Sequence, residues 1–447
     1  MSWLWIIYRK GWPRMANDFP PLPEQVRQAV LPNGLTVVGI EKPGFVRHYA
    51  QLTVFFGSAS ARRLTGANPG ASLPAGVAHF LEHKMFDKGD HDAADAFAAR
   101  GADVNAFTTR NVTNYYCSGL AHLQENVQDL LNFVLTPYFT AATVAKEQGI
   151  ISQEIQMYRD DPDYEPQQMV WDHLFPASVI AEDVAGSRQS IAGITPELLM
   201  AAYQTFYRPN NMQLVVVGDF NFDTLLTQLT IPAAAASAGP IPRSAVATAP
   251  VITAPRLLRA PLSLPEAWVG VRLPALPDPT QRLRVSLQLD LLLSGLLLES
   301  APDFLRLYQS GLIDDSFLVD AELHSNFGVL TVGGKTPAPA TLAQSLKEIL
   351  TPAHARAALT PAAFTRLQRE LIGRNITGFD HFGWLGAQLV DAADTRAADR
   401  RVVYPLPKLA AIIASLRYTD VLALADELFQ PAAMTTVLVS PDEEAAG

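Results

Sequence analysis

The chain has 447 residues, which is more than a single hydrophobic core usually holds, so its length predicts more than one domain. Hydrophobic residues make up 49% of the chain and charged residues 17%, a composition that excludes a globally disordered protein. The 34 basic and 44 acidic residues give a formal net charge of -10. This balance argues against non-specific nucleic-acid binding, which depends on Lys and Arg contacts to phosphates.

The N-terminus carries a short apolar run from Trp3 to Ile7, followed by Arg9 and Lys10. The run is too short to span a bilayer, and its charges follow the apolar residues, which is the reverse of a secretory signal. Met15 is an alternative start, because ordinary globular sequence begins there. No other segment has transmembrane length, so we expect no stable membrane insertion.

The chain contains one cysteine, Cys117, which excludes an intramolecular disulfide and a cysteine-rich metal site. We interpret this residue as a small buried hydrophobe. The lack of a disulfide framework fits a reducing compartment, so the expected localisation is cytoplasmic.

The first part of the chain alternates apolar strands with helices. A turn signal, Pro32-Asn33-Gly34, precedes the first strand, and Asp161-Pro162 ends the last long helix. The patterns predict strands at 35–40, 52–56, 105–108, 113–118 and 213–218, and helices at 76–86, 121–135 and 143–159.

An Ala- and Pro-rich segment at 231–265 predicts an extended linker between domains at 15–230 and 266–447. The second part repeats this alternation of strands and helices less clearly. Its patterns predict strands at 267–273, 327–333 and 434–439 and helices at 283–298 and 361–376. Each part ends on an apolar strand that follows helices. The sequence therefore predicts a duplication of α+β units.

The segment His79-Phe80-Leu81-Glu82-His83 places two histidines four residues apart, so both imidazoles lie on one face of a helix. Glu82 borders the same face. Two histidines leave a zinc site incomplete, because a catalytic site has a third protein ligand and an open position for water. The alternatives are two surface histidines on a solvated helix and a buried, hydrogen-bonded histidine pair without metal.

The helix predicted at 143–159 offers the missing ligand. Glu147 and Glu154 are seven residues apart and share one face, so either carboxylate could face the metal. Ile150, Ile151 and Ile155 are expected to pack this helix against the core.

The motif is that of the inverted zincins, and its surroundings resemble the pitrilysin/insulinase family of zinc peptidases, which includes the mitochondrial processing peptidases. The shared landmarks fall in family order within residues 30–220: Gly76-Val77-Ala78, Asn105-Ala106-Phe107-Thr108, the glutamates Glu147 and Glu154, the segment 186–194, and the segment 207–212. The resemblance implies two homologous α/β-sandwich domains with mixed, largely antiparallel sheets, forming half of a clamshell.

By this resemblance His79, His83 and Glu154 bind one zinc ion per chain, and Glu82 is the general base. Glu147, by the same resemblance, does not bind the metal but holds one of its ligands in place. Zinc lowers the pKa of its bound water to about 7 and polarises the scissile carbonyl. A carboxylate can take the proton of that water and pass it to the leaving amine.

The same resemblance makes Asn105, Ala106, Phe107 and Thr108 an exposed edge strand to which a substrate peptide adds as a further strand. An ordinary internal sheet strand is the alternative.

The resemblance fails at one point. Active family members carry an Arg and a Tyr, seven residues apart, in the C-terminal half, where they bind the substrate carbonyl and the oxyanion. When the alignment with the family is fixed at Gly311-Leu312, Leu307 and Asp314 occupy the positions of that Arg and Tyr. Arg306 and Tyr308 lie nearby but have the wrong spacing.

Some half-length bacterial members of this family work as two-subunit enzymes, and this chain resembles the zinc-bearing subunit. We therefore expect a paralogous partner that supplies Arg and Tyr, in a heterodimer. A homodimer is the alternative, with weak or no activity. The predicted function is a zinc metalloendopeptidase subunit acting on oligopeptides or small unfolded polypeptides. A further interpretation, with the same chemistry and a different substrate, is a maturation factor for a secreted signal or modified peptide. The alternative is a non-catalytic, metal-retaining scaffold or peptide-binding subunit.

Overall fold

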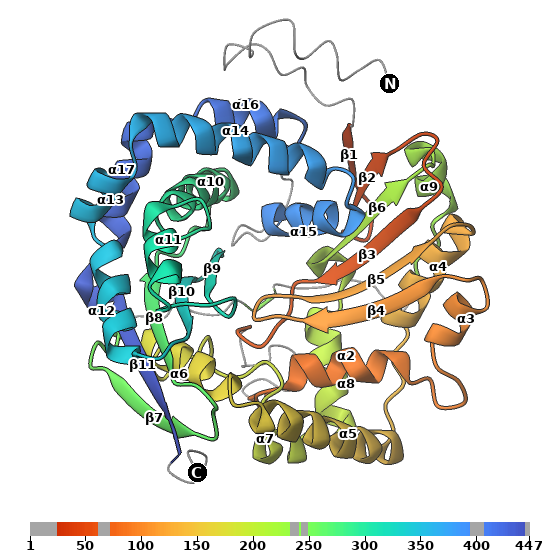
Figure 1. Ribbon diagram of the computed structural model, residues 1–447. Helices are drawn as coiled ribbons and strands as arrows, with labels where there is room; N and C mark the ends of the chain where they lie inside the picture. Colours follow the sequence, from red (N-terminus) through yellow and green to blue (C-terminus); the bar gives the residue numbers. More distant parts are fainter. Residues whose placement is uncertain (1–24, 61–71, 233–240, 243–248, 394–405, 443–447) are drawn as a thin grey trace, which may run out of the picture.

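The computed structural model describes residues 25–60, 72–232, 241–242, 249–393 and 406–442. The expectations about Met15 and the residues before it lie outside these ranges. Within them, Figure 1 shows two lobes, each built on one β-sheet with helices packed against it.

The N-terminal sheet has six strands in the order β1-β2-β6-β3-β5-β4. The strands β2 and β6 run parallel, and the other neighbours run antiparallel. Strand β6 lies near the middle of the sheet and is buried along its whole length, which explains its apolar sequence. The strands are β1 (Val26–Val30), β2 (Thr36–Glu41), β3 (His48–Val54), β4 (Asp103–Thr108), β5 (Thr113–Gly119) and β6 (Met212–Gly218).

Helices α2, α4 and α8 pack beside this sheet, and their buried residues form one core with β2, β3, β5 and β6. Cys117 belongs to this core, where burial raises the pKa of its thiol to about 12, so its interpretation as a buried hydrophobe is confirmed. The helices of this part are α2 (Val77–Phe86), α3 (Ala94–Ala98), α4 (Leu123–Leu135), α5 (Ala141–Asp160), α6 (Tyr164–Leu174), α7 (Arg188–Ala192), α8 (Pro196–Phe206), the 3-10 turn η1 (Pro209–Asn211) and α9 (Phe222–Gln228).

The C-terminal sheet has five strands in the order β7-β11-β8-β10-β9. Its pairing repeats that of β2-β6-β3-β5-β4: one parallel pair is followed by three antiparallel pairs. The predicted duplication and the predicted fold class are therefore confirmed. The strands are β7 (Arg256–Ala260), β8 (Glu266–Leu273), β9 (Leu318–Leu323), β10 (Gly328–Lys335) and β11 (Met434–Pro441).

The helix predicted at 283–298 corresponds to α10, whose leucines from Leu287 onward are buried in the C-terminal core. In the described residues, no helix is both long and apolar enough to cross a membrane. The helices of this part are α10 (Pro279–Leu296), α11 (Pro302–Gln309), α12 (Pro339–Ile349), α13 (Pro352–Ala358), α14 (Pro361–Gly378), α15 (Phe382–Ala393), α16 (Leu409–Ala414) and α17 (Tyr418–Leu428), with 3-10 turns η3 (Leu406–Lys408) and η4 (Pro431–Ala433).

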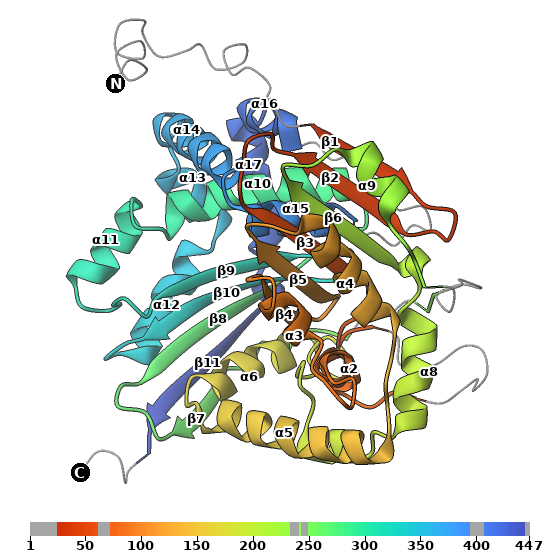
Figure 2. The same cartoon turned by 90° about the vertical axis from the view of Figure 1, so that its right-hand side faces the viewer.

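One helix from each lobe packs on the sheet of the other lobe. Helix α6 packs on β8 and β11, and α15 packs on β3 and β6 (Figures 1 and 2). A glycine allows the close approach on each side: a Cβ at Gly270 of β8 would lie 2.5 Å from Val170, and one at Gly386 of α15 would lie 2.7 Å from Gln51. The exchange fixes the two lobes against each other.

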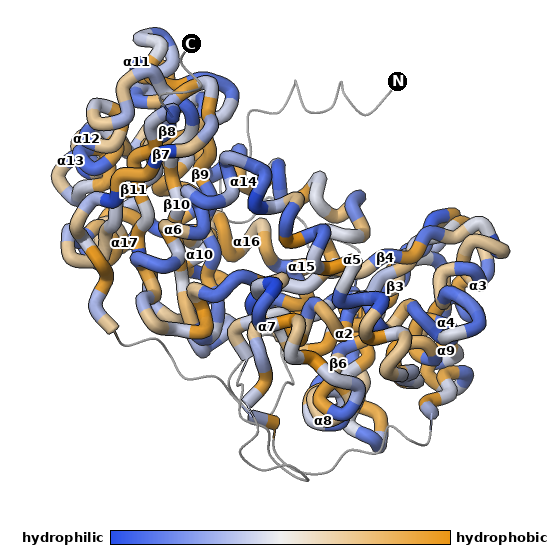
Figure 3. Tube along the Cα trace, turned by 90° about the horizontal axis from the view of Figure 1, so that it is seen from below, coloured by the Kyte–Doolittle hydropathy of each residue, from blue (hydrophilic) through white to orange (hydrophobic). Residues whose placement is uncertain are grey.

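Two features differ from the sequence-based expectation. Strand β7 lies inside the range 231–265 that was expected to be a linker, because it pairs with β11 at the far end of the chain. Strands β1 and β9 were not predicted, and both carry polar residues at the edge of a sheet. By contrast, the buried strands stand out by hydropathy in both lobes, as β6 and β11 show in Figure 3.

Candidate metal centre

Helix α2 presents its apolar side to the N-terminal core and its histidines to a cavity. Val77, Phe80 and Leu81 are buried in that core. The side chains of His79 and His83 are 12% and 25% exposed, so they lie near the surface of the helix layer without being fully solvated. This separation follows from the helical period, since residues 79 and 83 share one face.

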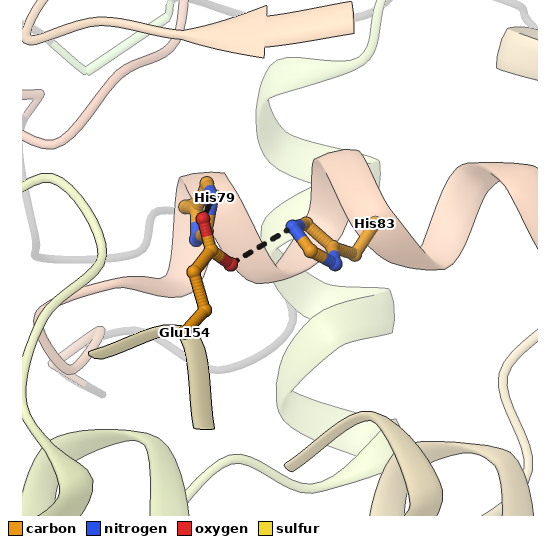
Figure 4. A group of neighbouring side chains, drawn as sticks. All are labelled: His79, His83 and Glu154. Atoms are coloured by element: carbon orange, nitrogen blue, oxygen red, sulfur yellow. Dashed lines mark ion pairs between the residues drawn. The ribbon is translucent and has the colours of Figure 1, made fainter. Parts of the chain in front are cut away.

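Three donor groups converge at this face (Figure 4). The Nε2 atom of His79 lies 3.6 Å from Oε1 of Glu154, and Nε2 of His83 lies 3.5 Å from Oε2 of the same carboxylate. One ligand atom from each residue lies within 4.8 Å of the others. In the part of the chain that the structure describes, no other group of His, Cys, Asp and Glu side chains has this arrangement.

Helix α5 supplies Glu154 and Glu147. Its start is fixed by a capping box between Thr140 and Thr143, and Ile151 and Ile155 are buried as expected. Ile150 is 43% exposed, so the expectation that it packs against the core was wrong. Its side chain points about 100° around the helix from that of Ile151, which turns it toward solvent.

The two glutamates differ in what they contact. Nδ1 of His83 lies 3.0 Å from Oε1 of Glu147, which is buried behind the histidine. A proton on Nδ1 donated to this carboxylate leaves the lone pair of Nε2 directed toward Glu154. Burial lowers the pKa of His83, but the hydrogen bond and charge of Glu147, with Glu82 and Glu154, outweigh it and raise that pKa overall.

His79 is held as a neutral imidazole. Burial, together with the neighbouring His83, lowers the pKa of His79 to about 4. Its Nδ1 atom is buried without a hydrogen-bond partner. A metal ligand must be deprotonated, so this environment suits a histidine that binds a cation through Nε2.

Glu82 lies beside these groups and is tied to strand β4. The hydroxyl of Thr108 donates a hydrogen bond of 2.6 Å to Oε2 of Glu82. Burial raises the pKa of Glu82, although the bond from Thr108 opposes this shift. A carboxylate with a raised pKa and a fixed position is suited to accept a proton.

The predicted edge strand is an edge strand. β4 ends the N-terminal sheet and pairs with β5 alone. Ala106 packs against the N-terminal core, and Thr108 reaches Glu82 on α2. Phe107 points to the opposite side of the sheet and is 44% exposed, and Asn105 is exposed as well. The free edge of β4 therefore lies next to Glu82.

The chemistry of the donor set fits zinc. Two imidazoles and one carboxylate are a frequent ligand set of catalytic zinc, and they leave a coordination position for water. The surrounding cavity, about 490 Å³ in volume, is lined by all three donors, by Glu82 and by Ala106 to Thr108. The structure thus brings together the residues predicted for the site.

Several residues at this cavity were not predicted from the sequence. Tyr158, one turn after Glu154 on α5, donates a hydrogen bond of 2.8 Å to Oε1 of Glu154. Arg110 lies 3.4 Å above the ring of Trp171 and donates to the carbonyl of Ile180. The spacing of four residues could have revealed Tyr158. Nothing in the sequence around Arg110 indicates its stacking partner.

The C-terminal residues aligned with the family's Arg and Tyr do not replace them. Leu307 is fully buried in the C-terminal core. Asp314 bonds to Ser316 in the turn before β9, and Arg306 pairs with Asp303 on its own helix.

Comparison with known proteins agrees with this geometry. Residues 66–188 match the family model "Insulinase (Peptidase family M16)", and residues 193–371 match "Peptidase M16 inactive domain". The chain belongs to peptidase family M16. The candidate metal centre of this M16 chain lies within the first match, and Leu307 lies within the second.

Named relatives of this M16 chain are zinc proteases. The uncharacterised zinc protease YmfH of Bacillus subtilis is 34% identical over 342 residues, which cover 74% of this chain and 79% of YmfH. An uncharacterised zinc protease of Mycobacterium tuberculosis is 32% identical over 219 residues, about half (48%) of each chain. A crystal structure of an M16-like peptidase from Alicyclobacillus acidocaldarius superposes with a TM-score of 0.83 at 28% identity, covering 94% of this chain and 99% of that one.

Proposed function

We propose that this chain is the metal-bearing subunit of a zinc endopeptidase that hydrolyses oligopeptides or small unfolded polypeptides. The observation that carries the proposal is the convergence of His79, His83 and Glu154 beside Glu82, at the free edge of β4. The names of the relatives support zinc as the metal.

A zinc ion held by these three residues would acidify a water molecule and polarise the peptide carbonyl. Side chains and backbone of this chain carry out proton transfer and peptide binding. Glu82 takes a proton from the water and passes it to the leaving amine, and Thr108 holds Glu82 in place. Strand β4 binds the peptide backbone through the hydrogen-bonding groups that β5 does not use.

One observation favours a second candidate, a metal-retaining subunit that binds peptides without cleaving them. Leu307 and Asp314 cannot bind a carbonyl or an oxyanion as Arg and Tyr do. A binding-only subunit, however, has no need of a buried carboxylate such as Glu82 at the donor group. We therefore prefer the peptidase, with a paralogous partner that supplies the missing groups.

The test replaces Glu82 by Gln in the chain purified with whichever subunit accompanies it from its native cells. Loss of the base should lower kcat on quenched peptides by about 100-fold or more, with zinc content unchanged. Glu197→Gln, on the exposed first turn of α8, is the matched control and should keep full activity. Equal cleavage by Glu82→Gln and the parent would remove Glu82 from the mechanism.

The partner requirement has its own measurement. The chain alone, loaded with zinc, should cleave the same peptides about 100-fold more slowly than the complex, because removal of an oxyanion donor has an effect of that order. Robust, chelator-sensitive cleavage by the lone chain would contradict the requirement.

A further inference from the structure

A second cavity lies on the opposite side of strand β4 from the metal centre. Its volume is about 450 Å³, and it is enclosed by the face of the N-terminal sheet, by α15 and by β9. Phe107 of β4 lines this cavity and also the cavity of the metal centre. The two cavities therefore meet at the strand to which the substrate is proposed to add.

Aromatic rings form the floor of the second cavity. The rings of Phe107 and Tyr116 are 6.1 Å apart, and those of Tyr116 and Tyr49 are 5.9 Å apart. These residues lie on β4, β5 and β3, which are neighbours in the sheet. The row thus runs from the free edge of the sheet toward its interior, and Phe107 is its exposed end.

The charged groups at this cavity are mixed in sign. Glu322 and Asp391 line it from the C-terminal lobe, together with His324, which lies 3.1 Å from Glu322. Arg47 lines it from the N-terminal lobe. Because acids and bases are both present, the rim favours neither sign of charge, and the aromatic floor is the feature that selects a ligand.

The alternation of strand residues connects this cavity to the substrate. In a strand added to β4, successive side chains point to opposite faces of the sheet. Side chains on one face lie beside Thr108 and Glu82. The side chains between them lie on the face of Phe107, toward the second cavity.

We propose that the second cavity binds a large apolar side chain of the peptide substrate, preferably an aromatic one, and so determines which peptides are bound. This inference rests on the proposed function, because it assumes that a peptide adds to β4. The ring at the exposed end of the row, Phe107, is the first contact of the incoming side chain, and Tyr116 is the second.

Peptide binding to the Glu82→Gln variant measures this selectivity without turnover. A fluorescent alanine-rich decapeptide carries one Phe, which is moved through each position in turn, and the dissociation constant is read from anisotropy. Burying the ring should tighten binding about tenfold or more at one position relative to the all-alanine peptide. No gain at any position would overturn the proposal.

A variant that fills the cavity tests its location. Gly383 of α15 lines the cavity, and a Cβ there meets no atom within 4 Å. The preference is the dissociation constant of the all-alanine peptide divided by that of the best Phe-containing peptide. Gly383→Phe in the Glu82→Gln background should reduce this ratio to about one. Gly373→Phe is the matched control, since Gly373 on α14 also faces open space and does not line the cavity. A preference that survives Gly383→Phe would overturn the proposal.

Circular dichroism and zinc content show whether Gly383→Phe folds. If it does not, Phe107→Ala in the same background takes its place, with the same loss of preference expected. The experiments distinguish failure of the cavity proposal from failure of the peptidase proposal. Selective binding without cleavage by the parent complex would leave the cavity's role intact and contradict the peptidase. Cleavage without any preference for Phe would contradict the cavity's role alone.

Discussion

Tyr158 shows how a single side chain can hold a proposed metal ligand in place. Burial, with the neighbouring Glu154, raises the pKa of Tyr158 to about 12, so its hydroxyl stays protonated at neutral pH and can donate to Glu154. The ring stacks on Tyr164, with centroids 5.9 Å apart. Removing a group that orients a ligand usually weakens metal binding by about 10- to 100-fold.

Tyr158→Phe keeps the ring stack and removes the hydrogen bond. We expect the affinity for zinc, measured by competition with a chromogenic chelator, to fall about tenfold. Tyr308→Phe is the control, because Tyr308 is also exposed and stacked, on Phe304 of α11, and has no part in the metal centre. Equal zinc affinity in Tyr158→Phe and the parent would show that the hydroxyl does not hold Glu154.

At this scale the sequence predicted the donors better than their supports. The spacing of His79 and His83 fixes a shared helix face, whatever the rest of the fold. The spacing of Glu147 and Glu154 did not separate their roles, because both lie on one face of α5. The structure separates them, since Glu147 reaches Nδ1 of His83 and Glu154 faces both Nε2 atoms.

Among the elements, the link between β4 and α2 joins the strand proposed to bind peptide to the proposed base, Glu82. Its only side-chain bond in the described structure is that from Thr108 to Glu82. Thr108→Val keeps the shape of the side chain and removes its donor. We expect kcat of the complex to fall about tenfold with little change in KM, since the loss affects the base more than the backbone contacts. Thr108→Ser should restore kcat, and a fall confined to KM would contradict this role.

Most strands that the sequence revealed are buried, and the exposed edge strand β4 is the exception. β6 is largely apolar because it is buried along its whole length, and α10 has its apolar run in the part that is buried in the C-terminal core. The strands that were missed are β1, β7 and β9. Of these, β1 and β9 lie at sheet edges, and apolar and polar residues alternate only weakly along them. β7 is also an edge strand, and its partner β11 lies almost 180 residues later, which local composition cannot indicate.

In the whole molecule, the two lobes are one repeated sheet topology joined by an exchange of helices. The repeat was visible in the sequence as two runs of strands and helices. The exchange was not, because α6 and α15 are amphipathic helices that could cover either sheet. It is decided by close approaches such as those at Gly270 and Gly386, which link residues more than 90 positions apart.

We propose that His79, His83 and Glu154 hold one catalytic zinc ion. Zinc content per chain, measured by plasma emission after dialysis against trace zinc, tests it most directly. We expect about one zinc per parent chain and about one for the control Glu165→Ala on α6, but little for Glu154→Ala, because two histidines alone hold zinc weakly. Full zinc occupancy in Glu154→Ala, or none in the parent, would contradict this ligand set.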